Sequence, residues 1–346
     1  MQKSQPHKTP GAPLRDEAQM HSDPPNIIFF GTPEFGKIIL ERLVRSPYKP
    51  SLVVTAPDKP VGREQEMSPP PVKLLAQEHK IVVIQPESLQ SFPTPLNQES
   101  KIKNQDQDHD HDIDIIIVAA YGKLLPKKIL EIPKYGTLNV HPSLLPRWRG
   151  SSPIQYAILN GDTKTGVTVM LADEELDHGP ILAQKEFGVS ISKISTPELS
   201  QALAELGAKL LTETIPKWVE GEIKPKEQVE ENATYSRILT KQDGHIDWSK
   251  TAEEIERQIR AFTPWPGSFT FWREKRIRIL GGFVLYLSAG KPLAPGQTFL
   301  YQEWHFAVQT GMGLFVIERL QLAGKEEMTM KEFLNGYAEI IGTMLA

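Results

Sequence analysis

Short, predominantly apolar runs constrain the fold of this chain more than any other feature. Four of them lie in the first 120 residues: NIIFF (26–30), SLVVTA (51–56), IVVI (81–84) and IDIIIVAA (113–120). Strands buried on both faces have this composition, whereas half-exposed strands alternate apolar and polar residues. Stretches of helical or loop character separate the runs. The alternation predicts an α/β, Rossmann-like domain with a parallel-rich sheet.

The rest of the sequence divides the chain further. An amphipathic helix beginning at Thr196 closes the first domain, which we place at residues 25–215. Residues 1–24 and a low-complexity insertion at about residues 97–112 are polar, and we expect the extension to be disordered. Residues 216–236 are charged, contain Gly and Pro, and predict a linker. Short alternating runs beyond it predict a small β-barrel of OB-like type over residues 237–346.

Composition excludes several kinds of protein. The chain has no cysteine, so it has no disulfide, zinc–thiolate site or cysteine nucleophile. Its 39 basic and 43 acidic residues give a formal charge of −4, so any contact with nucleic acid must be local. No apolar run approaches the roughly 20 residues that cross a bilayer. We expect a cytoplasmic protein of bacterial type that contacts no membrane; an organellar location stays open, and nothing in the sequence demands more than a monomer.

Two segments resemble a cofactor-binding turn and a metal site, but the details of each argue against that assignment. Gly31-Thr32-Pro33-Glu34-Phe35-Gly36 follows the first strand, where dinucleotide-binding folds cradle pyrophosphate. Pro33 stands where close backbone approach requires Gly, and Pro has no N–H to donate. His109 and His111 alternate with aspartates, but a polar run without an ordered scaffold is more typical of a solvated loop. We therefore expect neither a nicotinamide or flavin cofactor nor a metal.

Asn139 and His141 are the first candidates for chemistry. They lie two residues apart at the end of the predicted strand GTLNVH (136–141), so their side chains share one face. Ligands of open α/β sheets bind at the carboxyl ends of the strands. An amide beside an imidazole can donate to one carbonyl oxygen, as acyl transfer requires. A hydrogen-bonded strand end would show the same two residues, so the pair alone does not decide.

The residues that follow carry a resemblance to a known family. Asn-x-His is followed by Ser143-Leu144-Leu145-Pro146, and Leu176-Asp177-His178-Gly179 supplies a Leu-Asp-x-Gly turn. In this combination the chain resembles the formyltetrahydrofolate-dependent transferases. The resemblance implies 10-formyltetrahydrofolate as the formyl donor, with no metal. It also implies a catalytic triad of Asn139, His141 and Asp177, and a folate-binding turn formed by Ser143, Leu144, Leu145 and Pro146.

Further stretches are similar to one branch of that family, whose acceptor is the amino group of methionyl initiator tRNA. They include APDKPVGR, SPPPVK, NVHPSLLPRWRGSSPIQ and TPWPGSF, and the similarity runs from Asn26 to the C-terminus. The resemblance implies a role in translation initiation and a C-terminal domain that binds tRNA. Alternative acceptors are an amino sugar nucleotide, glycinamide ribonucleotide, or water in a hydrolase. A non-catalytic tRNA-binding relative is an alternative of a different class.

The same resemblance suggests how the triad acts. We expect Asn139 to donate to the formyl oxygen while protonated His141 stabilises that oxygen. Asp177 beside His141 would favour the imidazolium and help return the proton of the amine to the departing nitrogen of the folate.

Five arginines are candidates for tRNA contacts. Arg63 is the one basic residue left in the loop that is basic in the family, which here reads Gly62-Arg63-Glu64-Gln65-Glu66-Met67. Arg147 and Arg149 flank Trp148, and contact either phosphate or local carboxylates. Arg276 and Arg278 alternate with isoleucines, which predicts two charges on the outer face of a barrel strand.

Overall fold

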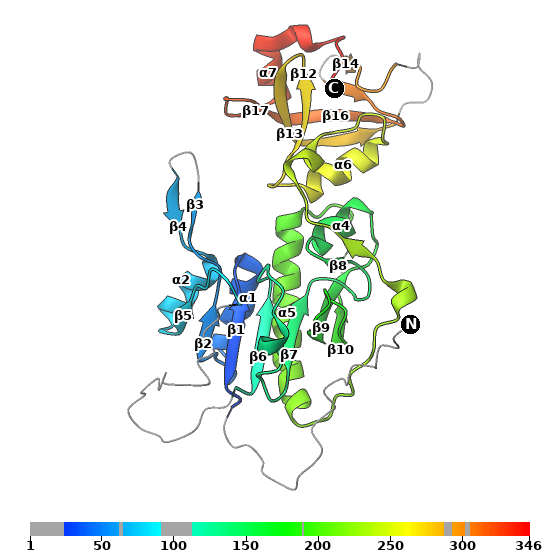
Figure 1. The fold of residues 1–346 in the computed structure, drawn as a ribbon. Helices are drawn as coiled ribbons and strands as arrows, with labels where there is room; N and C mark the ends of the chain where they lie inside the picture. Colours follow the sequence, from blue (N-terminus) through cyan, green and yellow to red (C-terminus); the bar gives the residue numbers. More distant parts are fainter. Residues whose placement is uncertain (1–23, 62–64, 91–112, 189, 287–292, 302–304) are drawn as a thin grey trace, which may run out of the picture. The chain divides into compact units, whose positions relative to one another are not determined.

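The computed structural model describes residues 24–346 except 62–64, 91–112, 189, 287–292 and 302–304. Arg63, the insertion and nearly all of the N-terminal extension therefore lie outside the described residues. The chain forms two compact units (Figure 1). The first comprises most of the residues up to Tyr235, and the second comprises residues 152–165, 188–199 and 236–346.

The first unit is built on a seven-stranded sheet in the order β10-β9-β7-β6-β1-β2-β5. The four apolar runs contain or overlap β1 (Ile27–Gly31), β2 (Leu52–Val54), β5 (Val82–Ile84) and β6 (Ile115–Ala119), and the predicted strand GTLNVH contains β7 (Thr137–His141). β9 (Gly166–Leu171) and β10 (Ile181–Glu186) complete the sheet. The first five are parallel to one another, and β9 and β10 are antiparallel to their neighbours. The predicted α/β class and parallel-rich sheet are confirmed.

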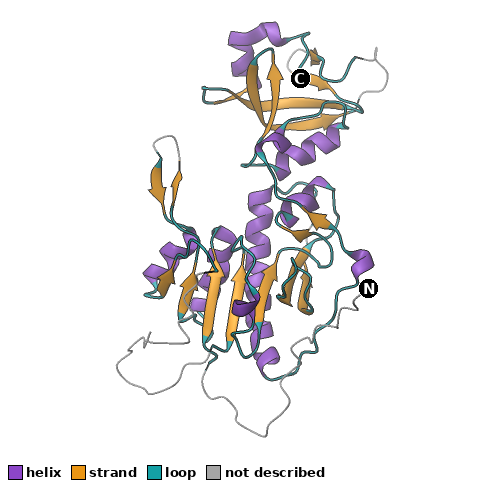
Figure 2. Ribbon diagram, in the orientation of Figure 1, coloured by secondary structure: helices purple, strands orange, loops and turns teal. Residues whose placement is uncertain are grey.

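Helices pack against this sheet, as Figure 2 shows for the long helix α5 (Thr196–Val219). A Cβ atom added at Gly207 of α5 would lie 2.8 Å from a methyl of Val140 and 3.1 Å from one of Val167. The helix can therefore approach β7 and β9 closely only because this residue has no side chain. The other helices of the unit are α1 (Glu34–Val44), α2 (Pro71–Glu78) and α3 (Lys127–Leu130).

A short hairpin, β3 (Lys59–Val61) and β4 (Glu66–Ser68), follows β2. No pattern in the sequence predicts this hairpin. Asp58, at its base, accepts hydrogen bonds from Lys73 of α2 and from Gln85, and these bonds lower the pKa of the Asp58 carboxyl, with Gln85 contributing most. The base of the hairpin is thereby tied to the unit.

The segment predicted as a linker is ordered over its length. Helix α5 continues to Val219, beyond the expected end near Ile215, and the Trp218 indole donates to the carbonyl of Tyr135 over 2.7 Å. Lys226 forms a β-bridge with Ile181, and the 3-10 helix η1 (Glu230–Asn232) follows. β11 (Tyr235–Ser236) then pairs with β8 (Arg149–Gly150). Residues 216–235 are therefore part of the first unit, whereas an open linker would carry none of these contacts.

The second unit contains an antiparallel sheet, as the alternating runs predict. The strand order is β12-β13-β16-β15-β14, with β17 beside β16. The bounds are β12 (Ser268–Trp272), β13 (Lys275–Leu285), β14 (Thr298–Tyr301), β15 (His305–Gln309), β16 (Leu314–Leu322) and β17 (Glu327–Thr329). Residues 344 and 345 form bridges to Gln297 and Trp272, so they join the two edges of the sheet and close a small barrel.

Helices complete the second unit: α4 (Pro153–Leu159), α6 (Ala252–Ala261) and α7 (Met330–Tyr337), with the 3-10 helices η2 (Lys241–Gly244) and η3 (Ala338–Ile340). The barrel core includes Trp272, Phe315 and Phe333, all almost fully buried. A capping box formed by Thr251 and Glu254 starts α6. None of the helices in the described part of the chain combines the length and apolar character of a bilayer-spanning segment.

Asp243 stabilises the start of the second unit in a pH-dependent way. Its carboxylate pairs with Arg237 and accepts bonds from the N–H and hydroxyl of Thr240 at 2.6 and 2.9 Å. These partners, Arg237 foremost, hold the pKa of Asp243 well below its usual value. A lowered folded-state pKa contributes stability above the unfolded-state value, and this contribution is lost as the pH falls.

We therefore expect Asp243→Ala to lower the free energy of unfolding by about 1 kcal/mol at pH 7. The difference should shrink as the pH falls below about 4, the usual Asp pKa. Urea unfolding at pH 7, 5 and 3 measures both, with Glu339→Ala as the control for an exposed carboxylate. A difference that persists unchanged at pH 3 would contradict the assignment.

Candidate active site

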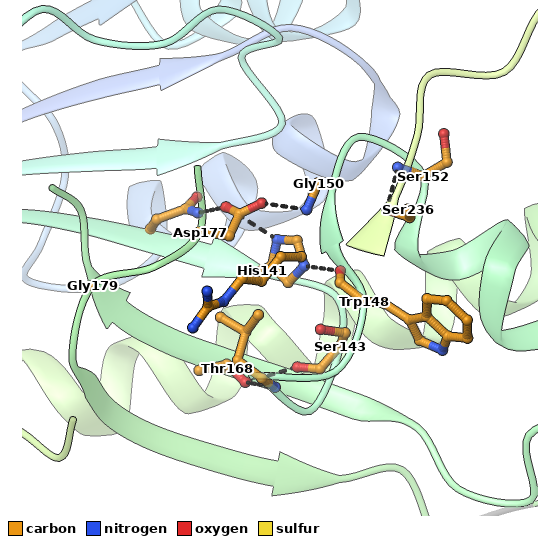
Figure 3. A network of polar contacts seen from close by, with 12 residues as sticks. His141, Ser143, Trp148, Gly150, Ser152, Thr168, Asp177, Gly179 and Ser236 are labelled. Atoms are coloured by element: carbon orange, nitrogen blue, oxygen red, sulfur yellow. Dashed lines mark hydrogen bonds and ion pairs between the residues drawn. The ribbon is translucent and has the colours of Figure 1, made fainter. Parts of the chain in front are cut away.

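The predicted triad comes together at the carboxyl edge of the first sheet. Asn139 and His141 belong to the last three residues of β7, of which His141 is the final one. Asp177 lies in the turn between β9 and β10. β9 is antiparallel to β7, so the last residue of β9 lies beside the start of β7. Local geometry alone would leave the turn after β9 at that start, away from His141 at the end of β7. The path of residues 172–180 brings Asp177 back to it. Figure 3 shows the Asp177 carboxylate joined by dashed lines to the ring of His141 and to the backbone nitrogen of Gly150.

The Asp177 carboxylate is held by several donors. One oxygen accepts from the Asn139 amide over 3.1 Å and lies 3.4 Å from His141 Nδ1. The other accepts the backbone N–H of Gly150 over 2.8 Å. The side chains of His141 and Asp177 are only 6% and 10% exposed, so a charge here depends on its neighbours rather than on water. The carboxylate is thus fixed in place and the Asn139 amide keeps one hydrogen for a ligand.

His141 is enclosed by two groups that can only accept hydrogen bonds. Its Nε2 lies 2.9 Å from the carbonyl oxygen of Trp148, on the opposite side of the ring from Asp177 (Figure 3). A ring whose two nitrogens face a carbonyl and a carboxylate is fully satisfied only when both nitrogens carry hydrogen. Hydrogen on both ring nitrogens stays a prediction, and it is the state in which the ring could donate to both neighbouring acceptors.

The backbone near this pair is strained. Trp148 and Asp177 have φ angles of 58° and 51°, in the left-handed region that residues with a Cβ rarely adopt. Such conformations cost about 1–3 kcal/mol each and persist only where surrounding contacts impose them. At Trp148 the conformation accompanies a carbonyl turned toward His141, and at Asp177 a carboxylate turned toward Asn139. Strain is therefore concentrated at the residues that face the imidazole.

The turn Ser143-Leu144-Leu145-Pro146 is held by internal bonds. The Ser143 hydroxyl donates to the carbonyl of Arg147 over 2.6 Å, and Thr168 Oγ1 donates to the carbonyl of Ser143 and accepts from the N–H of Leu145. The side chains of Ser143 and Leu145 are buried, whereas Leu144 and Pro146 are partly exposed. If this turn contacts folate, the side chains of Leu144 and Pro146 are the ones available.

Arg149 has a different environment from the one a phosphate contact needs. Its side chain is 2% exposed and donates to Gln228, Glu230 and Tyr235. The Arg149 guanidinium lowers the pKa of the Glu230 carboxyl. Of the two interpretations of this arginine, the structure favours pairing with a local carboxylate over a tRNA contact. Arg147 is partly exposed and stacks on the Trp148 ring at 4.6 Å.

Arg276 and Arg278 lie on β13 as predicted, with Ile277 and Ile279 in the barrel core between and beyond them. Both arginines are partly exposed. The guanidinium of Arg276 stacks 3.8 Å from the centre of the Phe269 ring, and that of Arg278 donates to the carbonyl of Pro264. The side chains are therefore ordered on one face of the strand.

A cavity of about 450 Å³ opens beside the segment that follows β6. Its walls are residues 87–90 and 123–127, with Glu174 from the turn that also carries Asp177. Leu124, Leu125 and Pro126 supply apolar surface, and Gln90 and Lys123 supply polar groups. None of these residues is among the site residues predicted from the sequence. Among the described residues, no three His, Cys, Asp or Glu side chains gather as a metal site would require.

Sequence reasoning also missed the backbone partners of the triad. The Gly150 N–H and the Trp148 carbonyl bind Asp177 and His141, yet a backbone group leaves no signature in residue type. The φ angle of Gly150 is 108°, a conformation that favours glycine. The one available signal was thus a glycine directly after Arg-Trp-Arg.

Gly179 provides a test of how closely the turn is fitted. An added Cβ would lie 1.9 Å from the backbone carbonyl oxygen of Leu171, so Gly179→Ala must displace the turn that carries Asp177. Misplacing a catalytic group by about 1 Å can cost roughly 10²-fold in rate, and we expect kcat to fall by about 10-fold or more. Gly188→Ala is the control, because its Cβ would meet no atom within 4 Å. Equal rates for the two variants would contradict the fit.

Two family models match the chain. The model for the formyl transferase family covers residues 25–215, and the model for the formyl transferase C-terminal domain covers residues 238–338. Solved structures with a similar fold include an N-formyltransferase from Helicobacter canadensis in complex with folinic acid and dTDP-3-aminofucose, at a TM-score of 0.60 and 18% identity over 88% of this chain and 100% of that one. HypX from Aquifex aeolicus in complex with tetrahydrofolic acid aligns at a TM-score of 0.58 and 16% identity, over 91% of this chain and 48% of that one.

Curated relatives are more similar in sequence. The methionyl-tRNA formyltransferase of Enterococcus faecalis is 40% identical over 90% of this chain and 96% of its own length. That of Caldanaerobacter subterraneus subsp. tengcongensis is 40% identical over 92% of this chain and 99% of its own length. With both domain models matched in order and identity of this level along nearly the whole chain, the protein belongs to the methionyl-tRNA formyltransferase family.

Proposed function

We propose that the chain transfers the formyl group of 10-formyltetrahydrofolate to the α-amino group of methionine esterified to initiator tRNA. The observation that carries this proposal is identity of about 40% over nine-tenths of the chain with methionyl-tRNA formyltransferases. The arrangement of Asn139, His141 and Asp177 supplies the chemistry that such a transfer needs. The sugar N-formyltransferases are similar at under 25% identity, which supports the fold and not their acceptors.

The residues at the carboxyl edge of the sheet fit a formyl folate. The cavity beside β6 combines an apolar wall with the polar groups of Gln90 and Lys123, as a flat heterocycle with polar edges requires. We propose that it takes part of the folate and that Leu144 and Pro146 contact the same molecule. The folate supplies a formyl carbon bound to nitrogen.

The chain's own residues then assist transfer. The α-amine of an aminoacyl ester attacks in its neutral form, and free α-amines titrate near pH 8, so no strong base is needed at the start. Asn139 donates its remaining amide hydrogen to the formyl oxygen, where negative charge develops. His141 contributes positive charge, since both of its nitrogens are already engaged by Asp177 and Trp148. The Asp177 carboxylate takes up the proton that the attacking amine loses, and this proton is returned to the leaving nitrogen as the bond between that nitrogen and the formyl carbon breaks.

Contacts with tRNA are proposed for Arg63, Arg147, Arg276 and Arg278. A stacked, partly exposed guanidinium such as that of Arg276 can meet a phosphate without losing its aromatic partner. The monomeric state and the cytoplasmic location expected from the sequence stay predictions. Sedimentation of the purified chain would test the first.

The deciding experiment is transfer of labelled formyl from 10-formyltetrahydrofolate to methionyl initiator tRNA. Methionyl elongator tRNA, an amino sugar nucleotide and glycinamide ribonucleotide serve as alternative acceptors, and His141→Ala as the site control. Selective labelling of the initiator tRNA, abolished by the substitution, is the expected result. Labelling of a small acceptor would keep the fold and the donor but overturn the tRNA assignment, and release of formate alone would indicate a hydrolase.

A further inference from the structure

We propose that Gln228 is a positioning residue of the active site, acting through Asp177, and that residues 228–234 hold the two groups that enclose His141. This inference rests on the proposed function and assigns part of its site to a segment that the sequence predicts to be a linker. Gln228, Glu230 and Thr234 are 51 or more residues away from Asp177 along the chain, so only the fold brings them together.

Every polar atom of the Gln228 side chain is hydrogen-bonded, and its Nε2 binds the turn that carries Asp177. Its Nε2 donates to the carbonyl oxygens of Asp177 over 2.9 Å and of Gly179 over 2.8 Å. Its Oε1 accepts from Arg149 Nε over 3.0 Å. An amide has two N–H donors and one carbonyl acceptor, and all of them are used here. The two carbonyls lie on either side of His178, so one side chain restrains the turn in which Asp177 adopts its left-handed backbone conformation.

Arg149 gives Gln228 a fixed support. Its buried guanidinium also binds Glu230, with the shorter contact at 2.9 Å, and the hydroxyl of Tyr235 over 3.2 Å. A buried guanidinium is strongly unfavourable without acceptors. Three acceptors of Arg149 lie in residues 228–235, so its burial costs less when that segment is docked. The position of Gln228 is therefore supported by a buried charge that favours the docked arrangement.

Thr234 performs the corresponding task on the other side of His141. Its hydroxyl oxygen accepts the N–H of Trp148 over 2.9 Å, and its own N–H donates to the carbonyl of Pro146 over 3.2 Å. These bonds fix the strained residue whose carbonyl faces His141 Nε2. Residues 228–234 thus restrain both the carboxylate and the carbonyl between which the imidazole lies.

The distance between His141 and Asp177 shows why such restraint matters. At 3.4 Å the pair is already longer than a good N–H···O hydrogen bond, so a small outward movement of the turn would separate the two groups. A displacement of about 1 Å at a reacting group can cost roughly 10²-fold in rate. Removing the restraint should therefore lower turnover while leaving substrate binding nearly intact.

The test uses the full chain and the formyl-transfer assay with methionyl initiator tRNA. We expect Gln228→Leu to lower kcat by about 10- to 100-fold and to change KM for either substrate by less than about threefold. Gln228→Glu keeps the length of the side chain and an acceptor for Arg149, but it cannot donate to Asp177 and Gly179. It should be impaired to a similar degree. Gln201→Leu, an exposed glutamine on α5, is the matched control.

A double-substitution cycle separates positioning from general damage. In an Asp177→Asn background, Gln228→Leu should reduce kcat by less than about threefold, because the group through which it acts is already lost. A full repeated loss in that background, or unimpaired turnover of Gln228→Glu, would overturn the proposal. Unchanged unfolding midpoints in urea would show that the variants fold.

A readout that does not depend on the substrate keeps the two proposals distinguishable. The Gly150 N–H donates to Asp177, so its hydrogen exchange reports whether the turn is in place. We expect exchange at Gly150 to accelerate about tenfold or more in Gln228→Leu and not in Gln201→Leu. Failure of the unsubstituted chain to formylate methionyl-tRNA would sink the proposed function alone. Unchanged exchange at Gly150 would sink the positioning role alone.

Discussion

Replacing Asp177 with Asn should lower kcat for formyl transfer by about 10²- to 10⁴-fold, the range over which a positioned acid–base group contributes. The carboxylate accepts from Asn139 and Gly150 and lies beside His141, and its side chain is only 10% exposed. An amide has one acceptor atom where the carboxylate has two, and it adds an N–H donor that would face Gly150 or Asn139. The His141 ring would also lose its negative partner.

Single-turnover rates with saturating formyl donor and tRNA measure this effect without a contribution from product release. Glu175→Gln is the matched control, because it removes one negative charge from the same turn at an exposed position. Equal losses of activity in the two variants would show that the rate depends on the total negative charge of the turn and not on the specific contacts of Asp177. A loss confined to KM would assign Asp177 to binding.

Asn139→Ala should reduce kcat by about 10²- to 10³-fold, as removal of one oxyanion donor usually does. The Asn139 amide is the side-chain donor in the network with a hydrogen to spare, because its bond to Asp177 uses one of two. His141 has both nitrogens engaged and cannot replace it. The loss should fall on kcat and on kcat/KM equally, since the contact strengthens as charge develops on the formyl oxygen.

Asn160→Ala, which truncates an exposed asparagine that bonds to a nearby aspartate, controls for loss of an amide as such. Asn139→Asp offers a second comparison, because it retains the size of the side chain but presents a second negative charge to Asp177. We expect it to be at least as impaired as Asn139→Ala. Activity near that of the unsubstituted chain in either Asn139 variant would show that the formyl oxygen is stabilised elsewhere.

The sheet of the first unit could be predicted because the composition of several of its strands is almost entirely apolar. NIIFF and IDIIIVAA became β1 and β6, since unbroken apolar runs are stable only when both faces are covered. The pair Asn139 and His141 could also be located, because two residues at the end of a strand share a face whatever surrounds them. Asp177 followed from family resemblance rather than from spacing.

What could not be predicted depends on contacts between distant residues. The sequence left Arg149 with two possible partners, a phosphate or a local carboxylate, because its partner Glu230 is 81 positions away along the chain. The segment 216–236 reads as a linker because it is polar and lacks a sustained period. It is ordered by bonds from its polar side chains to Arg149 and to backbone carbonyls, and a hydrophobic pattern carries no record of such bonds.

The burial of Arg149 also limits the positions at which domain recombination can occur in proteins of this kind. A gene fusion that joined a new C-terminal module directly after α5 would delete Gln228, Glu230 and Tyr235 together. The guanidinium would then be left without these acceptors, at a cost of about several kcal/mol. A recombination point after Tyr235 keeps Gln228, Glu230 and Tyr235 together with the first unit. Where second units have been exchanged successfully among relatives, the junction should therefore lie after residue 235 rather than at the end of α5.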